Sequence, residues 1–558
     1  MQTRKPRLPL LLLVVFSLSL ATSLINIPAI AAPSQPKANW SPCYRDFGYP
    51  YECTTVQVPL DYSNPGKAAI SIAMIRLPAS NQEERIGSLF LNPGGPGGSG
   101  FDFALYVAPF LYTEEVRARF DIVGFDPRGV GRSTALRCFG TPRQWGPYLT
   151  PFSFPITPEE EQTWIDADLY LVDACDQRGT RMIDHMSTAD VARDLDLLRQ
   201  AVGDEGLNYA GFSYGSYLGV TYANMFPDKV RAVVVDAVLD PIAWSTGETP
   251  EEGATLPFST RLHSDEGAMA TLKEFFRLCD AGGANCAFAG NAEERYASLA
   301  ARLRAQPILV ITPSGEIFSF TYQDLIGLSL GAMYDSFSWP EFANTLAAIE
   351  ALAPPEEIGL RLNTFWESLG FITKRGIPNY PNYLEGFPGV ACSDSDNPHD
   401  YEAWSTASKA AEEAYGYFGP IWTWTSSICA QWPGSMESRY AGPFTNQTAN
   451  PVLVVGNFYD PATRYEGAVR VSNLLPNSRL LSLNGWGHAS LFLSQCADQA
   501  VSNYLLTGAP PAEGTVCNQD LVPFIDFPML TSTGEAAAAG RSLVTPALLP
   551  DAVRKIHK

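Results

Sequence analysis

The sequence predicts an α/β fold with a mostly parallel central sheet, helices on both faces and an inserted, largely helical cap. Up to about residue 240, short apolar runs alternate with helical patterns, which is typical of parallel strands joined by helices. The later run Val452-Leu-Val-Val455 is continuously apolar, as expected of a strand covered on both faces. The alternation stops over residues 241–440, a helical and aromatic stretch that we interpret as a cap above the sheet edge.

Individual elements follow from the same patterns. Apolar runs predict strands at 54–58, 70–77, 88–91, 121–125 and 232–235. A helix is expected over 188–202, where apolar residues recur at helical spacing after a capping box formed by Ser187 and Asp190. Gly203 is expected to end this helix.

Composition and the N-terminal segment limit the possible classes of protein. Hydrophobic residues make up 46% of the 558, which excludes disorder for most of the chain. The formal net charge of −21 opposes nucleic-acid binding, which needs a basic face. Residues 1–31 have the features of a secretory signal peptide: a basic start, an apolar run over 8–25 and the cleavage motif Ala29-Ile-Ala31. An uncleaved membrane anchor is the alternative. Polar residues 34–37 disfavour it, and we expect a secreted, periplasmic or cell-envelope protein with no stable membrane span after cleavage.

The ten cysteines support export, because an even number of cysteines in an exported chain is typical of disulfides. We expect sequential pairing, although the sequence alone leaves connectivity open: Cys43/Cys53, Cys138/Cys175, Cys279/Cys286, Cys392/Cys429 and Cys496/Cys517. Metal binding is the alternative, and the absence of C-x-x-C and H-E-x-x-H motifs disfavours it.

The most informative motif is Gly211-Phe-Ser-Tyr-Gly215, between a short apolar run and a helical pattern. A sharp strand-to-helix turn would push the Ser213 hydroxyl out at the sheet edge, and the two glycines avoid clashes that a Cβ would cause. The helix that follows directs its positive dipole end at the same place. From the pentapeptide alone, an ordinary turn is the alternative.

A serine acts as a nucleophile only when a base takes its proton and a third group orients that base. The chain has five histidines, and His488 alone follows an apolar run, in a loop with glycines on both sides of Trp486. This setting suits an imidazole held over a sheet edge. The other four lie before a helix cap, in polar loops or in the terminal tail: His185, His263, His399 and His557.

The orienting acid is expected at another strand end, between the serine and the histidine in chain order. Asp460 meets this expectation because it follows the apolar run that begins at residue 452. Thr463 is placed to cap the next helix or to hydrogen-bond near Asp460. Asp236 is the competitor, with turn stabilisation as its alternative role, and Asp240 is a weaker rival.

A loop with five glycines follows the expected strand at 88–91. Such a loop can bring backbone N–H groups to a developing negative charge. The amides of Gly95 and of Tyr214, the residue after Ser213, are the best candidates for an oxyanion hole. Phosphate binding is the alternative, but the loop lacks a closing Lys-Ser/Thr and a G-x-G-x-x-G pattern.

Four elements thus occur in order: Asn92-Pro-Gly-Gly-Pro-Gly-Gly98, Gly211-Phe-Ser-Tyr-Gly215, Asp460-Pro-Ala-Thr463 and Gly485-Trp-Gly-His488. A fifth, Gly124-Phe-Asp-Pro-Arg-Gly-Val-Gly-Arg-Ser133, lies between the first two. From about residue 40 to 522, with the middle least similar, the chain resembles the α/β-hydrolase family of secreted tripeptidyl aminopeptidases and proline iminopeptidase relatives. The resemblance implies an α/β-hydrolase fold with Ser213 as nucleophile, His488 as base and Asp460 as orienting acid. It implies the amides of Gly95 and Tyr214 as oxyanion donors.

The resemblance also implies a serine exopeptidase that needs no metal or organic cofactor. It would release short peptides or a proline from peptide substrates with a free N-terminus. Such a substrate needs an acidic group near its ammonium. Asp394, with Asp396 beside it, is the candidate because a neighbouring cysteine can hold it in place; a solvated loop carboxylate is the alternative. The aromatic stretch over residues 415–424 would line a subsite or fill the cap's own core.

These observations divide the chain into a signal peptide (1–31), a first core part (32–240), a cap (241–440), a second core part (441–530) and a C-terminal extension (531–558). Two other functions stay open. One is a secreted carboxylesterase or lipase with the same three residues, because this type of core hosts several activities. The other is a binding or cell-envelope protein on a degenerate hydrolase core. The number of residues released, the side-chain preference and the oligomeric state do not follow from the sequence.

Overall fold

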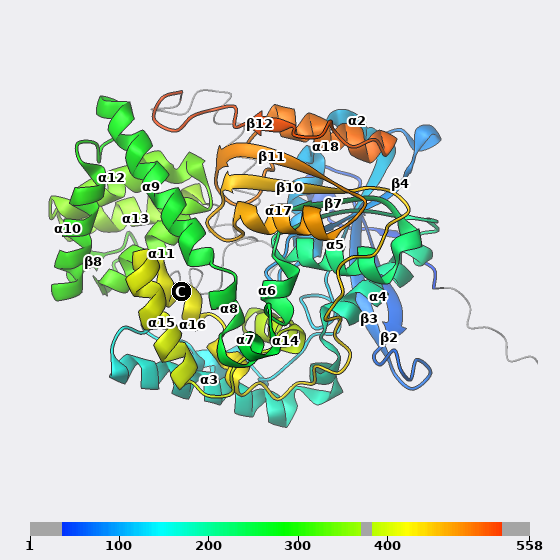
Figure 1. Cartoon of the computed structure of the whole chain (residues 1–558), viewed down its shortest axis with the longest axis horizontal. Coiled ribbons are helices and arrows are strands. Elements are labelled where there is room, and N and C mark those ends of the chain that lie inside the picture. The colour runs from blue at the N-terminus through cyan, green and yellow to red at the C-terminus, as the bar shows by residue number, and fades with distance from the viewer. Residues whose placement is uncertain (1–35, 370–381, 527–558) are drawn as a thin grey trace, which may run out of the picture. The chain divides into compact units, whose positions relative to one another are not determined.

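The described residues contain a ten-stranded sheet, whose strands are drawn as arrows in Figure 1. The computed structural model describes residues 36–369 and 382–526, so the expected signal peptide and the extension from 531 lie outside the described residues. The strand order is β1-β2-β3-β5-β4-β6-β7-β10-β11-β12. The strands are β1 (Ser41–Pro42), β2 (Glu52–Pro59), β3 (Ala69–Leu77), β4 (Gly87–Asn92), β5 (Phe120–Phe125), β6 (Leu207–Phe212), β7 (Val230–Asp236), β10 (Val452–Tyr459), β11 (Ser478–Trp486) and β12 (Val516–Asn518).

The prediction of a mostly parallel sheet is confirmed. Neighbouring strands pair in parallel from β5 to β12, whereas β1, β2, β3 and β5 pair antiparallel with one another along the order. The five strands expected from apolar runs correspond to β2, β3, β4, β5 and β7. Parallel order places the ends of β6, β7, β10 and β11 along one edge of the sheet, where catalytic side chains of such folds gather.

Both faces of the sheet are covered, which explains the continuous apolar runs in its central strands. Val233 and Val235 of β7 share one core with residues of α4 (Thr188–Ala201), α5 (Tyr214–Met225) and α17 (Tyr465–Leu474). Ala232 and Val234 pack on the other face with α1 (Gly100–Val107), α2 (Glu114–Arg119) and α18 (Gln495–Thr507). Successive side chains of a strand point to opposite faces, so each central strand supplies two cores.

The helix expected over 188–202 is α4. The Ser187 hydroxyl accepts a hydrogen bond from the backbone N–H of Asp190, and Gly203 follows the helix with a φ of +86°. The partners of the Asp190 carboxylate differ from those expected in a capping box. It accepts hydrogen bonds from the hydroxyls of Ser187 and Ser438, at 3.1 and 2.6 Å, and thereby ties the helix start to a distant loop.

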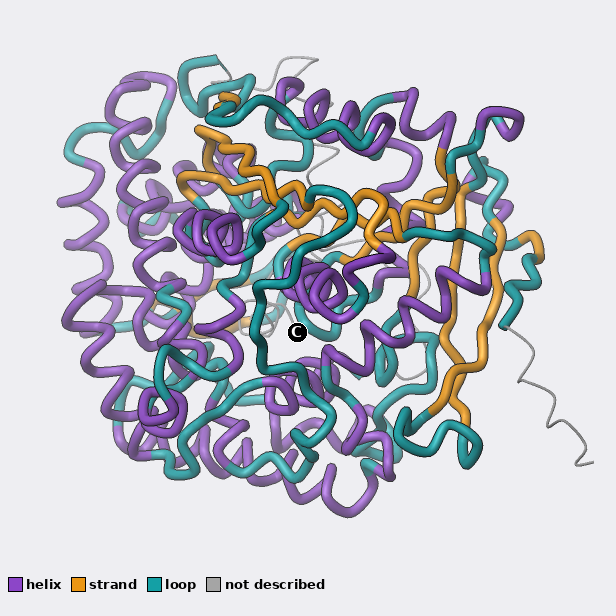
Figure 2. Tube along the Cα trace, turned by 45° about the vertical axis from the view of Figure 1, so that its right-hand side comes forward, coloured by secondary structure: helices purple, strands orange, loops and turns teal. Residues whose placement is uncertain are grey.

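A long insert between β7 and β10 contains eleven α-helices and a hairpin within its described residues. Figure 2 shows the helical group of the insert from a second direction, on the side opposite the long antiparallel strands. Trp339, Phe342 and Phe365 form part of its buried core. Its elements are α6 (Pro241–Ser245), α7 (Pro250–Thr255), α8 (Phe258–Arg261), α9 (Ser264–Gly282), α10 (Ala292–Ala305), β8 (Ile308–Ile311), β9 (Ile317–Phe320), α11 (Tyr322–Met333), α12 (Trp339–Glu350), α13 (Pro355–Ser368), α14 (Tyr383–Asp394), α15 (Glu402–Tyr415) and α16 (Gly419–Trp424).

One helix outside the insert joins it. The long helix α3 (Pro158–Arg178) precedes Ser213 in the chain, within the segment that the sequence assigns to the core. Trp164 of α3 packs with Trp404 and Trp424 of the insert in a separate aromatic cluster. The cover over the sheet edge therefore draws on two segments of the chain.

Five disulfides join the cysteines in sequential order: Cys43–Cys53, Cys138–Cys175, Cys279–Cys286, Cys392–Cys429 and Cys496–Cys517. A disulfide typically stabilises a fold by about 2–4 kcal/mol, mainly by restricting the unfolded chain. Cys392–Cys429 connects α14 to the segment after α16, and so joins two parts of the insert. Among the described residues, no helix combines the length and apolarity needed to cross a bilayer.

Candidate active site

Ser213 lies at a sharp turn between β6 and α5. Its backbone has a φ of +57° and a ψ of −128°, a conformation that side-chain-bearing residues rarely adopt and that often marks a functional site. The turn is held by a hydrogen bond of 3.1 Å from the Ser213 N–H to the carbonyl of Asp236. A Cβ on Gly211 would lie 2.2 Å from the carbonyl oxygen of Gly215, and a Cβ on Gly215 would lie 2.4 Å from that of Asn92. Both glycines of the motif are therefore required by close backbone contacts.

Asp460 and His488 form a buried pair at the ends of β10 and β11. Nδ1 of His488 lies 2.8 and 2.9 Å from the two carboxylate oxygens of Asp460. Thr463 also holds this carboxylate, through its backbone N–H at 2.8 Å and its hydroxyl at 3.0 Å, as expected from the sequence. Because Nδ1 faces the carboxylate, proton exchange with a hydroxyl falls to Nε2.

The rival acids have other partners. The Asp236 carboxylate accepts hydrogen bonds from the backbone N–H and hydroxyl of Ser490, two residues after His488, at 3.1 and 2.6 Å. Burial raises the pKa of Asp236 to about 6. Asp240 caps α6 by accepting from the N–H groups of Ile242 and Ala243. Asp236 therefore supports the histidine loop, a role that its position in the sequence does not reveal.

The other histidines lie in different environments. His263 precedes α9, and burial lowers its pKa. Nδ1 of the exposed His399 lies 3.4 Å from the carbonyl of Ala430. His185 ends a short 3-10 helix, and its carbonyl accepts from Arg128. His557 lies outside the described residues.

The glycine-rich loop lies directly against Ser213. A Cβ on Gly94 would be 2.9 Å from that of Ser213 and 2.8 Å from the backbone nitrogen of Tyr214. Gly95 has a φ of +111° and lines the same cavity as Ser213. The carboxylate of Asp126 secures the end of the loop by accepting from the Ser99 hydroxyl at 2.5 Å and the Phe101 N–H at 3.1 Å. This contact gives the Asp-Pro-Arg segment a structural role beside the site.

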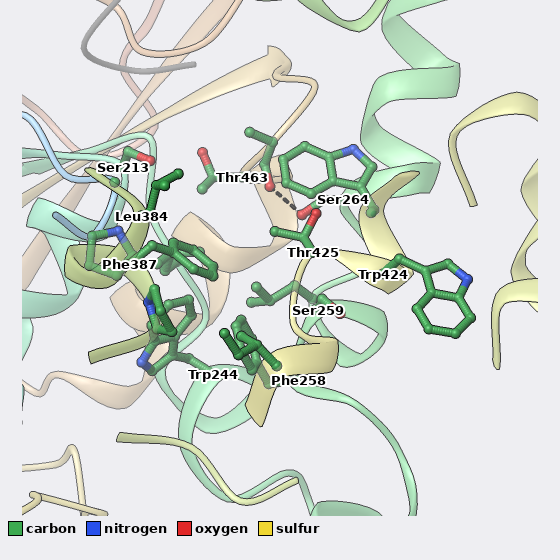
Figure 3. Close-up of a pocket in the computed structure, with 18 of the residues that line it drawn as sticks. Ser213, Trp244, Phe258, Ser259, Ser264, Leu384, Phe387, Trp424, Thr425 and Thr463 are labelled. Carbon is green, nitrogen blue, oxygen red and sulfur yellow. Dashed lines mark hydrogen bonds between the residues drawn. The ribbon is translucent and has the colours of Figure 1, made fainter. Parts of the chain in front are cut away.

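An aromatic cavity opens beside Ser213 and extends into the insert between β7 and β10 (Figure 3). Figure 3 shows Ser213 and Trp424 on opposite sides, with Trp244, Phe258 and Phe387 along the wall between them. The aromatic stretch over 415–424 takes both of the roles expected for it. Trp422 and Trp424 line the cavity, whereas Phe418 is buried in the core. Mostly apolar walls with a few polar groups are typical of small-molecule and peptide sites.

Two cavity residues carry no recognisable signal in the sequence. Asp168 of α3 lines the cavity with 4% of its surface exposed, and its carboxylate accepts from the Ser427 hydroxyl at 2.5 Å. Tyr334 follows α11, and its ring meets the His488 ring edge to face with centroids 4.9 Å apart. The backbone carbonyl of Tyr334 accepts a hydrogen bond from the backbone N–H of His488 at 3.0 Å. Both come from segments far from the motifs in the chain.

The acids expected near a substrate ammonium have other surroundings. Asp394 is 1% exposed, accepts from the N–H and hydroxyl of Thr188 at 2.8 and 2.6 Å, and is not among the described residues that line the cavity. Burial raises its pKa to about 7. Asp396 forms an ion pair of 2.9 Å with Arg439. The cysteine at 392 does fix this segment, but it directs Asp394 to the start of α4.

Comparisons with known proteins agree with this arrangement. Residues 87–256 match the family described as alpha/beta hydrolase fold, and residues 415–517 match the family described as TAP-like protein. The tripeptidyl aminopeptidase of Streptomyces coelicolor is 28% identical, over 89% of each chain. Carboxylesterase B of Mycobacterium tuberculosis is 30% identical over 86% of this chain and 90% of its own. Serine protease Hip1 of the same organism is 30% identical over 83% and 87%.

The matched regions include the glycine-rich loop and the serine turn in one part and the Asp460–His488 pair in the other. The alignments to the first and second of these relatives cover 89% and 86% of this chain. This chain is a member of the α/β-hydrolase family with a TAP-like C-terminal region.

Proposed function

We propose that this protein is a secreted serine aminopeptidase that releases short peptides from free N-termini through an acyl-enzyme on Ser213. The observation that carries the proposal is the buried Asp460–His488 pair beside a cavity that Ser213 and Gly95 line. Thr463 connects the two, since it donates to Asp460 and also lines the cavity. The names of relatives, tripeptidyl aminopeptidase and serine protease, support the same reaction class.

The reaction is a two-step acyl transfer. His488 takes the proton of Ser213 as the hydroxyl oxygen attacks the scissile carbonyl, and Asp460 holds the imidazole in the required tautomer. The backbone amides of Gly95 and Tyr214 stabilise the oxyanion, and losing one such donor typically costs about 10²–10³ in rate. His488 then gives its proton to the leaving amine. Water, deprotonated by His488, releases the acyl group and restores Ser213.

Asp168 supplies the acidic group that an aminopeptidase needs, and it replaces Asp394 and Asp396 in that role. It is the sole carboxylate side chain among the described residues that line the aromatic cavity. The hydroxyl of Ser427 joins it to the Trp424 region, on the side of the cavity opposite Ser213. A substrate ammonium at Asp168 and a scissile carbonyl at Ser213 would span the cavity. The separation between them would then limit how many residues are released.

Peptide amides with free and acetylated N-termini test the proposal. We expect hydrolysis of the free form, loss of turnover in Ser213→Ala, and a product profile that gives the number of residues released. Asp168→Asn should raise KM for free peptides far more than for acetylated ones. Asp396→Asn, at a carboxylate paired with Arg439, should leave KM unchanged. Equal turnover of free and acetylated peptides by the wild type would contradict the role of Asp168.

A carboxylesterase is the second candidate, because carboxylesterase B is among the relatives and the cavity walls are mostly apolar. Short acyl esters assayed beside the peptides separate the two activities. Turnover of esters alone would replace the aminopeptidase proposal. A fluorophosphonate probe tests the third possibility, a binding protein on this scaffold, since failure to label Ser213 would indicate an inactive site.

Export is part of the proposal. Five disulfides are typical of proteins that fold in oxidising compartments. The basic, apolar and A-x-A features of the first 31 residues supply the signal. Sequencing the N-terminus of the exported protein should find cleavage after Ala31.

A further inference from the structure

A charged groove lies next to the aromatic cavity. It has a volume of about 530 Å³ and runs between the start of the insert and α17. The insert contributes Glu248 and Arg261, and α17 with the residue before it contributes Arg464, Glu466 and Arg470. Its size falls within the range of about 300–1,000 Å³ that is usual for ligand sites.

The groove and the aromatic cavity share one wall. Leu239, Leu262, Ala462 and Thr463 line both spaces, so a single layer of side chains separates them. Thr463 in this layer donates its hydroxyl hydrogen to Asp460. The shared wall therefore begins beside the Asp460–His488 pair.

We propose that the groove binds the segment of the peptide that follows the scissile bond. This inference rests on the proposed function. When the N-terminal part of a substrate fills the aromatic cavity, the remaining chain must leave on the other side of the scissile carbonyl. The leaving nitrogen receives its proton from His488, so the leaving segment passes this histidine. Thr463, which lines the groove, has its hydroxyl oxygen 3.4 Å from Nδ1 of this histidine.

The charges and exposure of the groove suit a polypeptide. Glu248 and Glu466 expose 57% and 69% of their side chains, so the groove opens to solvent and sets no limit on the length of the leaving segment. Arg470 reaches from α17 to Glu248 and, at 3.3 Å, to Asp240. Carboxylates and guanidinium groups together offer acceptors and donors to the backbone of an extended peptide. The substrate class is thus a polypeptide rather than a short peptide amide.

Substrates with one N-terminal sequence and different leaving groups test the inference. The leaving group is an arylamine or a segment of one, three or five residues, and the measured quantity is the ratio of kcat/KM for each segment to that for the arylamide. We expect this ratio to rise with segment length by about tenfold, because binding remote from the reacting bond is used in the transition state. Val469→Trp, which fills the groove from α17, should abolish the rise. Gln499→Trp, exposed on α18, is the matched control and should retain it.

A second variant does not depend on tolerance of a bulky side chain. Glu466→Lys reverses an exposed charge and should shift the preference between lysine- and glutamate-containing leaving segments by about two- to fivefold toward glutamate. A flat ratio in the wild type, or ratios and preferences that neither Val469→Trp nor Glu466→Lys changes, would overturn the inference. If no peptide with a free N-terminus is cleaved, the proposed function itself fails. If such peptides are cleaved with a flat ratio, the groove proposal alone fails.

Discussion

Gly94 shows how a residue without a side chain sets the geometry beside Ser213. It adopts a φ of +99°, and a Cβ there would lie 2.5 Å from the carbonyl oxygen of Phe212. Both features exclude other residues, because positive φ strains L-residues and the loop has no space to move away from the turn.

We expect Gly94→Ala to reduce kcat at least about 10²-fold, since the loop that would supply an oxyanion donor must shift away from Ser213. Rates of hydrolysis and of fluorophosphonate labelling measure the effect, and circular dichroism checks the fold. Gly66→Ala is the control, because a Cβ at Gly66 meets no atom within 4 Å. An active Gly94→Ala enzyme would show that the loop does not contribute to the reaction.

Asp236 positions two parts of the site at once. Its backbone carbonyl holds the Ser213 turn, and its carboxylate holds the histidine loop through Ser490. It is not among the described residues that line the cavity, so its influence on the reaction must pass through these contacts.

Asp236→Asn should lower kcat by about tenfold or more with little change in KM. The substitution replaces a carboxylate oxygen that accepts from Ser490 with an amide group, which displaces the histidine loop. Steady-state kinetics with a peptide amide that has a free N-terminus measures both kcat and KM. Asp121→Asn alters an equally buried carboxylate that binds Arg76 and Arg85, and it should affect stability but not kcat. Equal effects of both variants on kcat would contradict a positioning role for Asp236.

At the scale of elements, the start of α4 depends on a carboxylate from the insert. Asp394 of α14 accepts from the first residue of α4, Thr188, and Cys392–Cys429 holds α14 in place. The contact joins the insert to a helix that covers the sheet. A negative charge near a helix start is favourable, but burial opposes it, and the pKa of Asp394 rises to about 7.

The raised pKa predicts a pH-dependent stability. Because the folded protein holds the Asp394 proton up to about pH 7 and the unfolded chain loses it near its ordinary value of 3.8, the contribution of this group is full below pH 3.8 and declines toward pH 7. Asp394→Asn lacks this decline. The difference in unfolding free energy, variant minus wild type, should therefore increase by up to about 4 kcal/mol between pH 4 and 8. Denaturant unfolding measures the difference, and a constant difference across this range would contradict the prediction.

At the scale of the whole molecule, a buried ion pair connects the antiparallel edge of the sheet to its helical cover. The guanidinium of Arg128 donates to Asp194 of α4 at 2.6 and 2.7 Å and to the carbonyls of Pro59 and Leu60 at 2.9 Å. Both charged side chains are fully buried.

Arg128→Ala should lower the free energy of unfolding by about 3–5 kcal/mol, because it leaves the charge of Asp194 buried and unpaired. The double variant Arg128→Met with Asp194→Leu removes both charges and should recover part of this loss. Denaturant unfolding compares the two proteins. A double variant less stable than Arg128→Ala would contradict the unpaired charge of Asp194 as the cause of the loss.

Features that depend on neighbouring residues could be predicted from the sequence. The turn at Ser213 needs Gly211 and Gly215 because of contacts within a few residues, and Asp460 and His488 each follow an apolar strand. Parallel strands bring such ends to one edge, so the contact between Asp460 and His488 was expected from the chain order. The contact of Asp394 with Thr188 could not be predicted in this way. A nearby cysteine indicated that Asp394 is held in place, but not the direction in which its carboxylate points.

The amino-acid sequence was sufficient to predict the α/β class, the parallel strands, the elements that carry Ser213, Asp460 and His488, and the cysteines available for disulfides. These features follow from local sterics and from apolar periodicity, which act over a few residues. Three other features became visible in the folded protein: α3 brings Asp168 to the cavity, Tyr334 contacts His488, and Asp236 supports the histidine loop. Those contacts join segments far apart in the chain, and their geometry depends on how helices pack over the sheet, which no short stretch of residues encodes.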